Sequence, residues 1–194
     1  MLHPKTEVKF ISHEVGYGVV ATDFIPAGTI TWALDAFDQV FSQKDFEKMD
    51  HAHQHIIETY SFRNRNGNYV LCWDNGRFQN HSFKSNCLTT AYDFEIAIRD
   101  INIGDQLTDD YGYLNIERPF RGIDEGTKRK IVYPDDLLRH HTVWDKKIKK
   151  VFHKIAVSPQ PLGELLTEVT WEKINLIINK NKEMDSILEN YYPQ

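Results

Sequence analysis

The sequence of 194 residues has little cysteine and no long apolar run. Its two cysteines, Cys72 and Cys87, are too few for a four-cysteine zinc site or a disulfide framework. We therefore expect a reducing, cytoplasmic environment and no bound metal. No stretch of about 18 apolar residues is present, so we expect no contact with a membrane. The opening residues, "MLHPKTEVKF", contain no apolar segment, and we expect no secretory signal there.

An excess of positive charge is also missing. The chain carries 23 basic and 28 acidic side chains, for a formal net charge of −5. Proteins that bind nucleic acid generally present a basic field, so this balance argues against a nucleic-acid partner. The basic stretch from Lys128 to Lys154 keeps that alternative open, although we favour the solvated face of an amphipathic helix as its explanation. The acidic balance suits a basic protein partner.

The chain changes character along its length. Residues 5–122 contain short strand-like segments separated by turns, including 69–73, 94–98 and 106–108, with a helical pattern at about 43–59 that Ser42 can cap. Residues 123–134 are polar and contain glycine, which indicates a connecting loop. Residues 135–192 have helical periodicity. We predict a mainly β (α+β) domain, a loop, and a helical C-terminal extension packed on the domain.

One face of the first helix in this extension is apolar. Asp135 and Asp136 fall in its first turn, where negative charge favours the helix dipole. The positions that recur at helical spacing are Leu137, His141, Trp144, Ile148, Val151 and Ile155.

A dense polar segment separates two strand-like segments. Residues 77–87, "RFQNHSFKSNC", follow "NYVLCW" and precede an apolar stretch beginning at Leu88. Such a segment is either a solvated connector or a polar turn that holds a polar ligand. Local composition does not separate the two alternatives.

The order of three motifs does separate them. The segment "RFQNHSFKSN" is preceded by "GYG" and followed by "GDQLTDDYG", and "YSF" and "YVLCWD" lie between the first two. This order resembles the SET-domain family of protein lysine methyltransferases, and is closest to small bacterial-type SET proteins. The resemblance covers residues 8 to about 115. It implies a SET-type β-clip fold with a pseudoknot, S-adenosylmethionine as cofactor, and a lysine of a protein or peptide as substrate.

The resemblance also implies roles for particular residues. Tyr111 corresponds to the catalytic tyrosine of the family, and Tyr60 to a tyrosine of the lysine channel that assists it. We expect Asp109 and Tyr113 to line the same channel. The polar segment then becomes part of a cofactor site, whose expected residues are Gly16, Tyr17, Gly18, Asn80, His81 and Phe120.

The proposed reaction accounts for these residue types. An unperturbed lysine, with a pKa of ~10.4, is neutral in roughly one molecule in 2,500 at pH 7, which corresponds to ~4.6 kcal/mol. A neighbouring sulfonium cation and an apolar channel both lower that pKa. Tyrosines provide apolar walls and hydroxyl groups that orient the amine.

The sequence departs from the family at two positions. Phe83 replaces the cysteine that binds zinc in many members, so another wall has to close the channel. We expect that wall to come from the C-terminal extension, with at least one of Tyr113, Phe120 and Tyr133 bordering the channel. Asp109 stands where many members have Phe or Tyr, so the number of methyl groups transferred stays open.

Two alternatives to the enzyme remain in view. A catalytically silent SET module could bind a protein partner through the C-terminal extension. The intact set of motif residues argues against it, because a silent module has no reason to keep them. A nucleic-acid binder is the third class. The oligomeric state stays open between a monomer and a dimer formed through the C-terminal helices.

Overall fold

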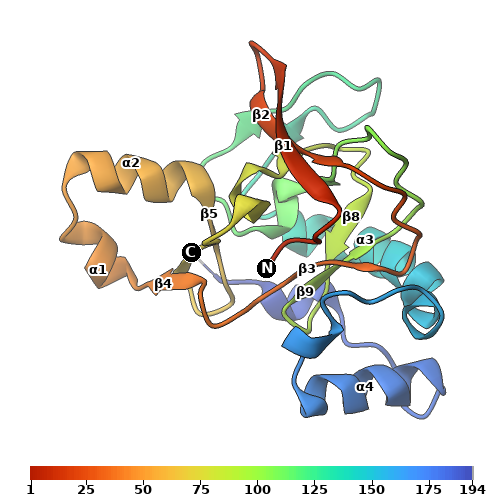
Figure 1. Ribbon diagram of the computed structural model, residues 1–194. Helices are drawn as coiled ribbons and strands as arrows, with labels where there is room; N and C mark the ends of the chain where they lie inside the picture. The colour runs from red at the N-terminus through yellow and green to blue at the C-terminus, as the bar shows by residue number, and fades with distance from the viewer. Residues whose placement is uncertain (194) are drawn as a thin grey trace.

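The computed structural model describes residues 1–193 as several small β-sheets with helices on two sides (Figure 1). The strands are β1 (Thr6–Ser12), β2 (Gly16–Ala21), β3 (Ile30–Ala33), β4 (Gln39–Phe41), β5 (Ser61–Arg63), β6 (Tyr69–Leu71), β7 (Asn80–His81), β8 (Cys87–Thr89), β9 (Phe94–Ala97), β10 (Thr108–Asp109), β11 (Phe120–Arg121) and β12 (Ile131–Val132). The helices are α1 (Gln43–Glu47), α2 (His51–Tyr60), α3 (Asp136–Phe152) and α4 (Glu168–Ile178). Short 3-10 turns are η1 (Asn75–Phe78), η2 (Tyr111–Tyr113), η3 (His153–Ala156), η4 (Gly163–Leu165) and η5 (Ile187–Asn190).

Most strands pair with antiparallel neighbours. β1 and β2 form a hairpin, and the two three-stranded sheets have the orders β3-β9-β8 and β4-β6-β5. The predicted strands at 69–73 and 94–98 are confirmed as β6 and β9, and the one at 106–108 is displaced to β10. The mixed α+β class is therefore confirmed.

One parallel pair joins distant parts of the chain. In it, Thr108 of β10 lies opposite Asn80 of β7. Just before β10, the Leu107 N–H donates to the Val19 carbonyl at 2.9 Å. From the other side, Asn86 Nδ2 donates to the Gln106 carbonyl at 2.7 Å. The segment is thus tucked between β2 and the turn after β7, which is the predicted pseudoknot.

The helical insert consists of two helices rather than one continuous segment. The predicted N-cap is confirmed: Ser42 and Asp45 form a capping box at the start of α1. Asp50 then caps α2, its side chain accepting the His53 N–H at 2.9 Å. Because a cap residue takes an extended backbone conformation, helix α1 cannot continue through Asp50.

The C-terminal helices cover the β3-β9-β8 sheet. In Figure 1, α3 lies behind this sheet and α4 at its lower edge, while α1 and α2 project on the opposite side. Trp144 and Ile148 of α3 share one core cluster with Ile30 and Phe94 of the sheet. The predicted apolar face is confirmed except at His141, which is only half-buried.

The connecting segment is more ordered than predicted. Instead of a loop over the whole of 123–134, its second half contains β12, and Phe120 of β11 pairs with Val132.

The helices of the described chain are too short or too polar to cross a membrane.

Candidate active site

The polar segment meets the glycine-containing strand at β2. Asn80 Nδ2 donates to the Tyr17 carbonyl at 3.0 Å and to Gln106 Oε1 at 3.3 Å. A Cβ atom on Gly18 would lie 2.6 Å from Asn80 Nδ2, so only glycine permits this approach. Gly16 starts the strand with φ of 81°. Four residues predicted to hold the cofactor therefore lie together.

His81 lies within a group of aromatic rings. Its ring centroid is 4.5 Å from that of Phe83, 5.5 Å from Tyr111 and 5.3 Å from Phe120. Burial lowers the pKa of the imidazole, so the ring is neutral at pH 7. Nδ1 accepts the Tyr111 N–H at 3.2 Å, which leaves the ring proton on Nε2. Over residues 1–193, that buried Nε2 has no hydrogen-bond partner.

Tyr111 lies between this cluster and a cavity. Its hydroxyl donates to the Gln79 carbonyl at 2.6 Å. Burial, and then the nearby Asp109 carboxyl, raise the pKa of the phenol. The hydroxyl therefore stays protonated at neutral pH, with its proton directed at Gln79 and its oxygen able to accept a hydrogen bond.

The cavity has a volume of about 740 Å³ and extends from α2 to η2. Tyr60, at the end of α2, is 37% exposed and meets the Phe78 ring edge-on. Asp109, at the other extreme, is only 9% exposed. The predicted channel residues all line the cavity, namely Tyr60, Asp109, Tyr111 and Tyr113, and Phe120 joins them. The predicted cofactor residues of β2 and β7 do not line it.

Two buried carboxyl groups meet on the wall of the cavity. Glu95 is 3% exposed and accepts hydrogen bonds from Thr31 Oγ1 at 2.5 Å and Gln79 Nε2 at 2.8 Å. Asp109 accepts from the Tyr113 hydroxyl and hydrogen-bonds Glu95. Burial, followed by the charge of Glu95, raises the pKa of Asp109 well above its usual range. Two carboxyl groups this close resist ionising together, so Asp109 keeps its proton more readily than a free carboxyl group does.

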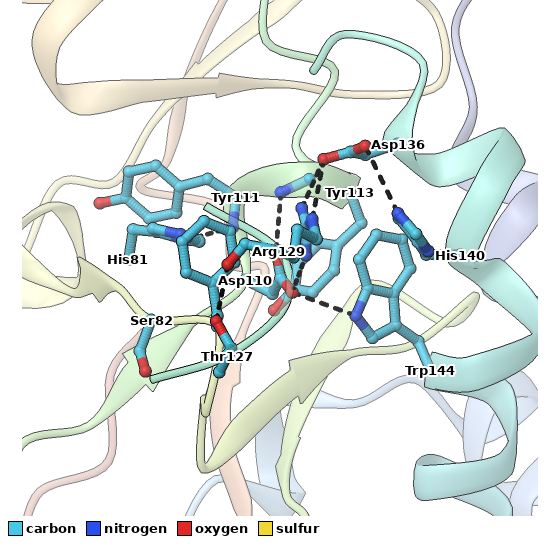
Figure 2. A network of polar contacts seen from close by, with 12 residues as sticks. His81, Ser82, Asp110, Tyr111, Tyr113, Thr127, Arg129, Asp136, His140 and Trp144 are labelled. Carbon is cyan, nitrogen blue, oxygen red and sulfur yellow. Dashed lines mark hydrogen bonds and ion pairs between the residues drawn. The ribbon is translucent and has the colours of Figure 1, made fainter. Parts of the chain in front are cut away.

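The next residue, Asp110, lies beside a cation instead of a second carboxyl group. Figure 2 shows Arg129 between Asp110 and Asp136, with Trp144 and His140 beside them. Arg129 Nη1 lies 2.5 Å from Asp110 Oδ2, and Nη2 lies 2.5 Å from Asp136 Oδ2. Burial lowers the pKa of the guanidinium, but the bonds to both aspartates outweigh it and raise that pKa. This ion network ties the residue before Tyr111 to α3.

The connecting segment also packs on the turn at Ser82 and Phe83, where the sequence has no zinc-binding cysteine. Glu125 accepts from Ser82 Oγ at 2.6 Å and from the Phe83 N–H at 2.7 Å. Gly122 packs so closely that a Cβ on it would lie 2.7 Å from Phe83 Cε2. Within residues 1–193, no group of three or more metal-binding side chains is present. Carboxylate and aromatic contacts close this side of the site.

The remaining aromatic residues differ in their placement. Tyr113 is fully buried, with its ring centroid 5.4 Å from that of Trp144. Tyr133 lies away from the cavity, 38% exposed, under the guanidinium of Arg139. Tyr17 is 58% exposed and contributes its carbonyl group to the site. Of Tyr113, Phe120 and Tyr133, at least one of which we predicted to border the channel, the first two line the cavity and Tyr133 does not.

Three important residues were not found from the sequence. Glu95 had a signal, because a single acid inside the apolar strand "DFEIAI" indicates a buried carboxyl group. Gln79 lies within the polar segment but was not assigned a role. Arg129 lies in a polar loop, and nothing in its local sequence separates it from solvated arginines.

The chain tucked beneath the turn after β7, with a tyrosine directly behind it, has the arrangement of a SET-type methyltransferase. The SET-domain family model matches residues 16–112, which is half of the chain. The protein therefore belongs to the SET-domain family, whose members are in general protein lysine methyltransferases. A search of curated proteins found no match to the chain.

Proposed function

We propose that the protein transfers a methyl group from S-adenosylmethionine to the side-chain amine of a lysine in another protein. The observation that carries this proposal is the position of Tyr111. Its main-chain N–H binds His81 of the predicted cofactor site, and its hydroxyl binds the carbonyl of Gln79, which lines the cavity together with Tyr111. A cofactor and a lysine approaching from these two sides would meet at this tyrosine.

The residues near β7 fit S-adenosylmethionine. Both amide protons of Asn80 are used by Tyr17 and Gln106, so its carbonyl oxygen is available to the ammonium of the methionine part. The Nε2–H of His81 is a buried donor without an acceptor in the described chain, and it lies beside Phe120. A heteroaromatic base supplies both an acceptor and a stacking face, so an adenine fits there.

The chain's own residues then orient and enclose the amine. When bound, S-adenosylmethionine supplies a methyl group on a sulfonium, and the amine has to face that carbon in line. The Tyr111 oxygen can accept one N–H of the amine, because its own proton is directed at Gln79. Tyr60 lines the cavity and packs against Phe78, and this aromatic contact would limit the access of water to the bound amine.

A basic protein segment is the substrate that we propose. The net charge of −5 favours a positively charged partner. At the rim of the cavity, Arg63 is paired with Glu117 at 2.6 Å and Arg65 with Asp93 at 3.2 Å. These pairs weaken the repulsion that the rim arginines would otherwise exert on a basic peptide.

The direct experiment is methyl transfer from labelled S-adenosylmethionine into a whole-cell lysate and into histones, followed by mass spectrometry of the labelled site. We expect label on lysine, and a loss of roughly 100-fold or more in Tyr111→Phe. Tyr133→Phe is the matched control, since Tyr133 lies outside the cavity. Label on another residue type, or equal rates in Tyr111→Phe, would contradict the proposal.

Cofactor binding is measured separately from transfer. S-adenosylhomocysteine should raise the Tm of the wild type, since a ligand that binds the native state stabilises it by mass action. Asn80→Ala should greatly reduce this shift. A chain that binds the cofactor but labels nothing would favour the silent SET module, whereas an unchanged shift in Asn80→Ala would place the cofactor elsewhere.

A further inference from the structure

The carboxyl pair Asp109–Glu95 faces the cavity and has no resident cation. Across residues 1–193, neither carboxyl group forms an ion pair with a lysine, arginine or histidine. Arg129 is taken by Asp110 and Asp136. A buried charge is costly unless it is paired, so the missing positive charge is expected from a ligand.

The groups packed around the pair do not provide that charge. Element by element, they are Thr31 on β3, Gln79 after η1, Cys87 on β8, and Asp110, Tyr111 and Tyr113 after β10. Burial raises the pKa of the Cys87 thiol and of both phenols, so these three stay uncharged at neutral pH. Asp110 is neutralised by Arg129. None of these groups therefore supplies a positive charge to the carboxyl pair.

A second polar group in the cavity is also unsatisfied. Trp32 is 9% exposed and lines the cavity, and within the described chain its indole Nε1 has only the weakly accepting thiol of Cys72 beside it. The indole N–H requires an acceptor, while the Asp109–Glu95 pair requires a cation. A peptide that carries lysine offers both, as a backbone carbonyl and a side-chain ammonium.

We propose that the Asp109–Glu95 pair binds the ammonium group of the substrate lysine and accepts one of its protons. This inference rests on the proposed function. In the transfer, one N–H bond of the ammonium breaks and one O–H bond forms on the ionised carboxylate. The electron pair stays on nitrogen, so a cation and an anion become a neutral amine and a neutral acid. The neutral amine is the form that attacks a methyl group, and bulk water at pH 7 leaves it at about one part in 2,500.

Binding is tested with n-butylammonium, which reproduces the end of a lysine side chain, against n-butanol, which has similar size and no charge. NMR titrations are made on the wild type, Asp109→Asn, Glu95→Gln and the double variant. Each single variant retains one carboxyl group, which ionises without an acidic neighbour. We expect the wild type and both single variants to prefer the cation by roughly tenfold or more, a preference of ~1.4 kcal/mol. The double variant should have none.

Two outcomes overturn the binding role: a wild type that binds both probes equally, or a double variant that keeps the cation preference. The comparison of the two probes on the wild type needs no variant, so it remains valid even if the double variant fails to fold. It also needs no methyl transfer. Failure of the proposed function would instead appear as absent lysine labelling and an absent Tm shift with S-adenosylhomocysteine, whatever the two probes do.

Proton acceptance is tested by the pH dependence of transfer to the lysine identified in the lysate. We expect the wild-type rate to level off near neutral pH. In the double variant the amine has to lose its proton to water, so the rate should keep rising toward the ordinary lysine pKa of ~10.4. Superimposable pH profiles would exclude the pair as proton acceptor, while a purely structural loss would lower the rate without shifting the profile.

Discussion

Asp109 and Asp110 are adjacent in sequence and both are buried, yet they lie on opposite sides of the strand that precedes Tyr111. Asp110 faces α3 and the connecting segment, where Arg129 neutralises it within the protein. Asp109 faces the cavity, where burial and then the neighbouring Glu95 raise its pKa, and no cation among residues 1–193 forms an ion pair with it. A charge that is paired internally holds the fold together. One that is left unpaired in a cavity is available to a ligand, at the expense of stability.

Removing the internal cation should have the largest effect. Arg129→Met leaves Asp110 and Asp136 buried without their partner, and breaking a buried ion pair in this way costs about 3–5 kcal/mol. Arg65→Met is the matched control, because its pair with Asp93 is exposed and is worth less than ~1 kcal/mol. Urea denaturation measures both. If Arg129→Met lowered the free energy of unfolding by less than ~1 kcal/mol, the proposed difference between the paired Asp110 and the unpaired Asp109 would be wrong.

Isosteric substitution compares the neighbours directly. Asp110→Asn removes a charge-assisted bond to Arg129 and should lower the free energy of unfolding by about 2–3 kcal/mol. Asp109→Asn imitates the protonated acid, retaining an acceptor for Tyr113 and a donor for Glu95. It should therefore change the free energy of unfolding by no more than ~1 kcal/mol below pH ~4, where the unfolded wild type also holds the proton, and should be more stable than the wild type at pH 7. Equal losses in the two variants would contradict the comparison.

The pH dependence of the free energy of unfolding tests the raised pKa of Asp109. Its pKa in the folded protein is raised, so the folded state binds the proton more tightly than the unfolded state does. The resulting stabilisation is complete below pH ~4 and is lost as the pH rises toward the folded value. Asp109→Asn does not titrate. Relative to the wild type, it should gain stability as the pH rises from 4 to 8, and a pH-independent difference would contradict the raised pKa.

The smallest expected effect concerns the hydroxyl group that binds Asp109. Tyr113→Phe removes one hydrogen bond from a buried carboxyl and should cost ~1 kcal/mol at pH 7. Tyr133→Phe, at an exposed ring, should leave the free energy of unfolding unchanged. The two variants are distinguished by thermal or urea denaturation. A Tyr113→Phe protein as stable as Tyr133→Phe would show that Asp109 does not depend on this hydroxyl.

Local sequence predicted the parts of the site that depend on the motif. Gly18, Asn80 and Tyr111 stand in the family's order, and the pseudoknot brings them together as the family fold requires. The break between α1 and α2 at Asp50 was missed because the apolar periodicity continues across this position. The role of Asp50 as an N-cap becomes visible only in the folded structure. Arg129 could not be found, since its partners lie just after β10 and on α3 and no local pattern records such pairing.

The late position of β10 has a consequence for protein synthesis. A growing chain that ends before Thr108 contains Asn80 and His81 but has nothing to pair with β7. In a longer chain, the contacts of Asp110 with Arg129 and Trp144 are complete only after Trp144 has been made. At 5–20 residues per second, the 63 residues from His81 to Trp144 (144 − 81) take roughly 3–13 s to add. During that interval the nascent strands of β3, β8 and β9 expose the surface that α3 later covers. Prematurely terminated products should therefore be inactive and should depend on chaperones for as long as they persist.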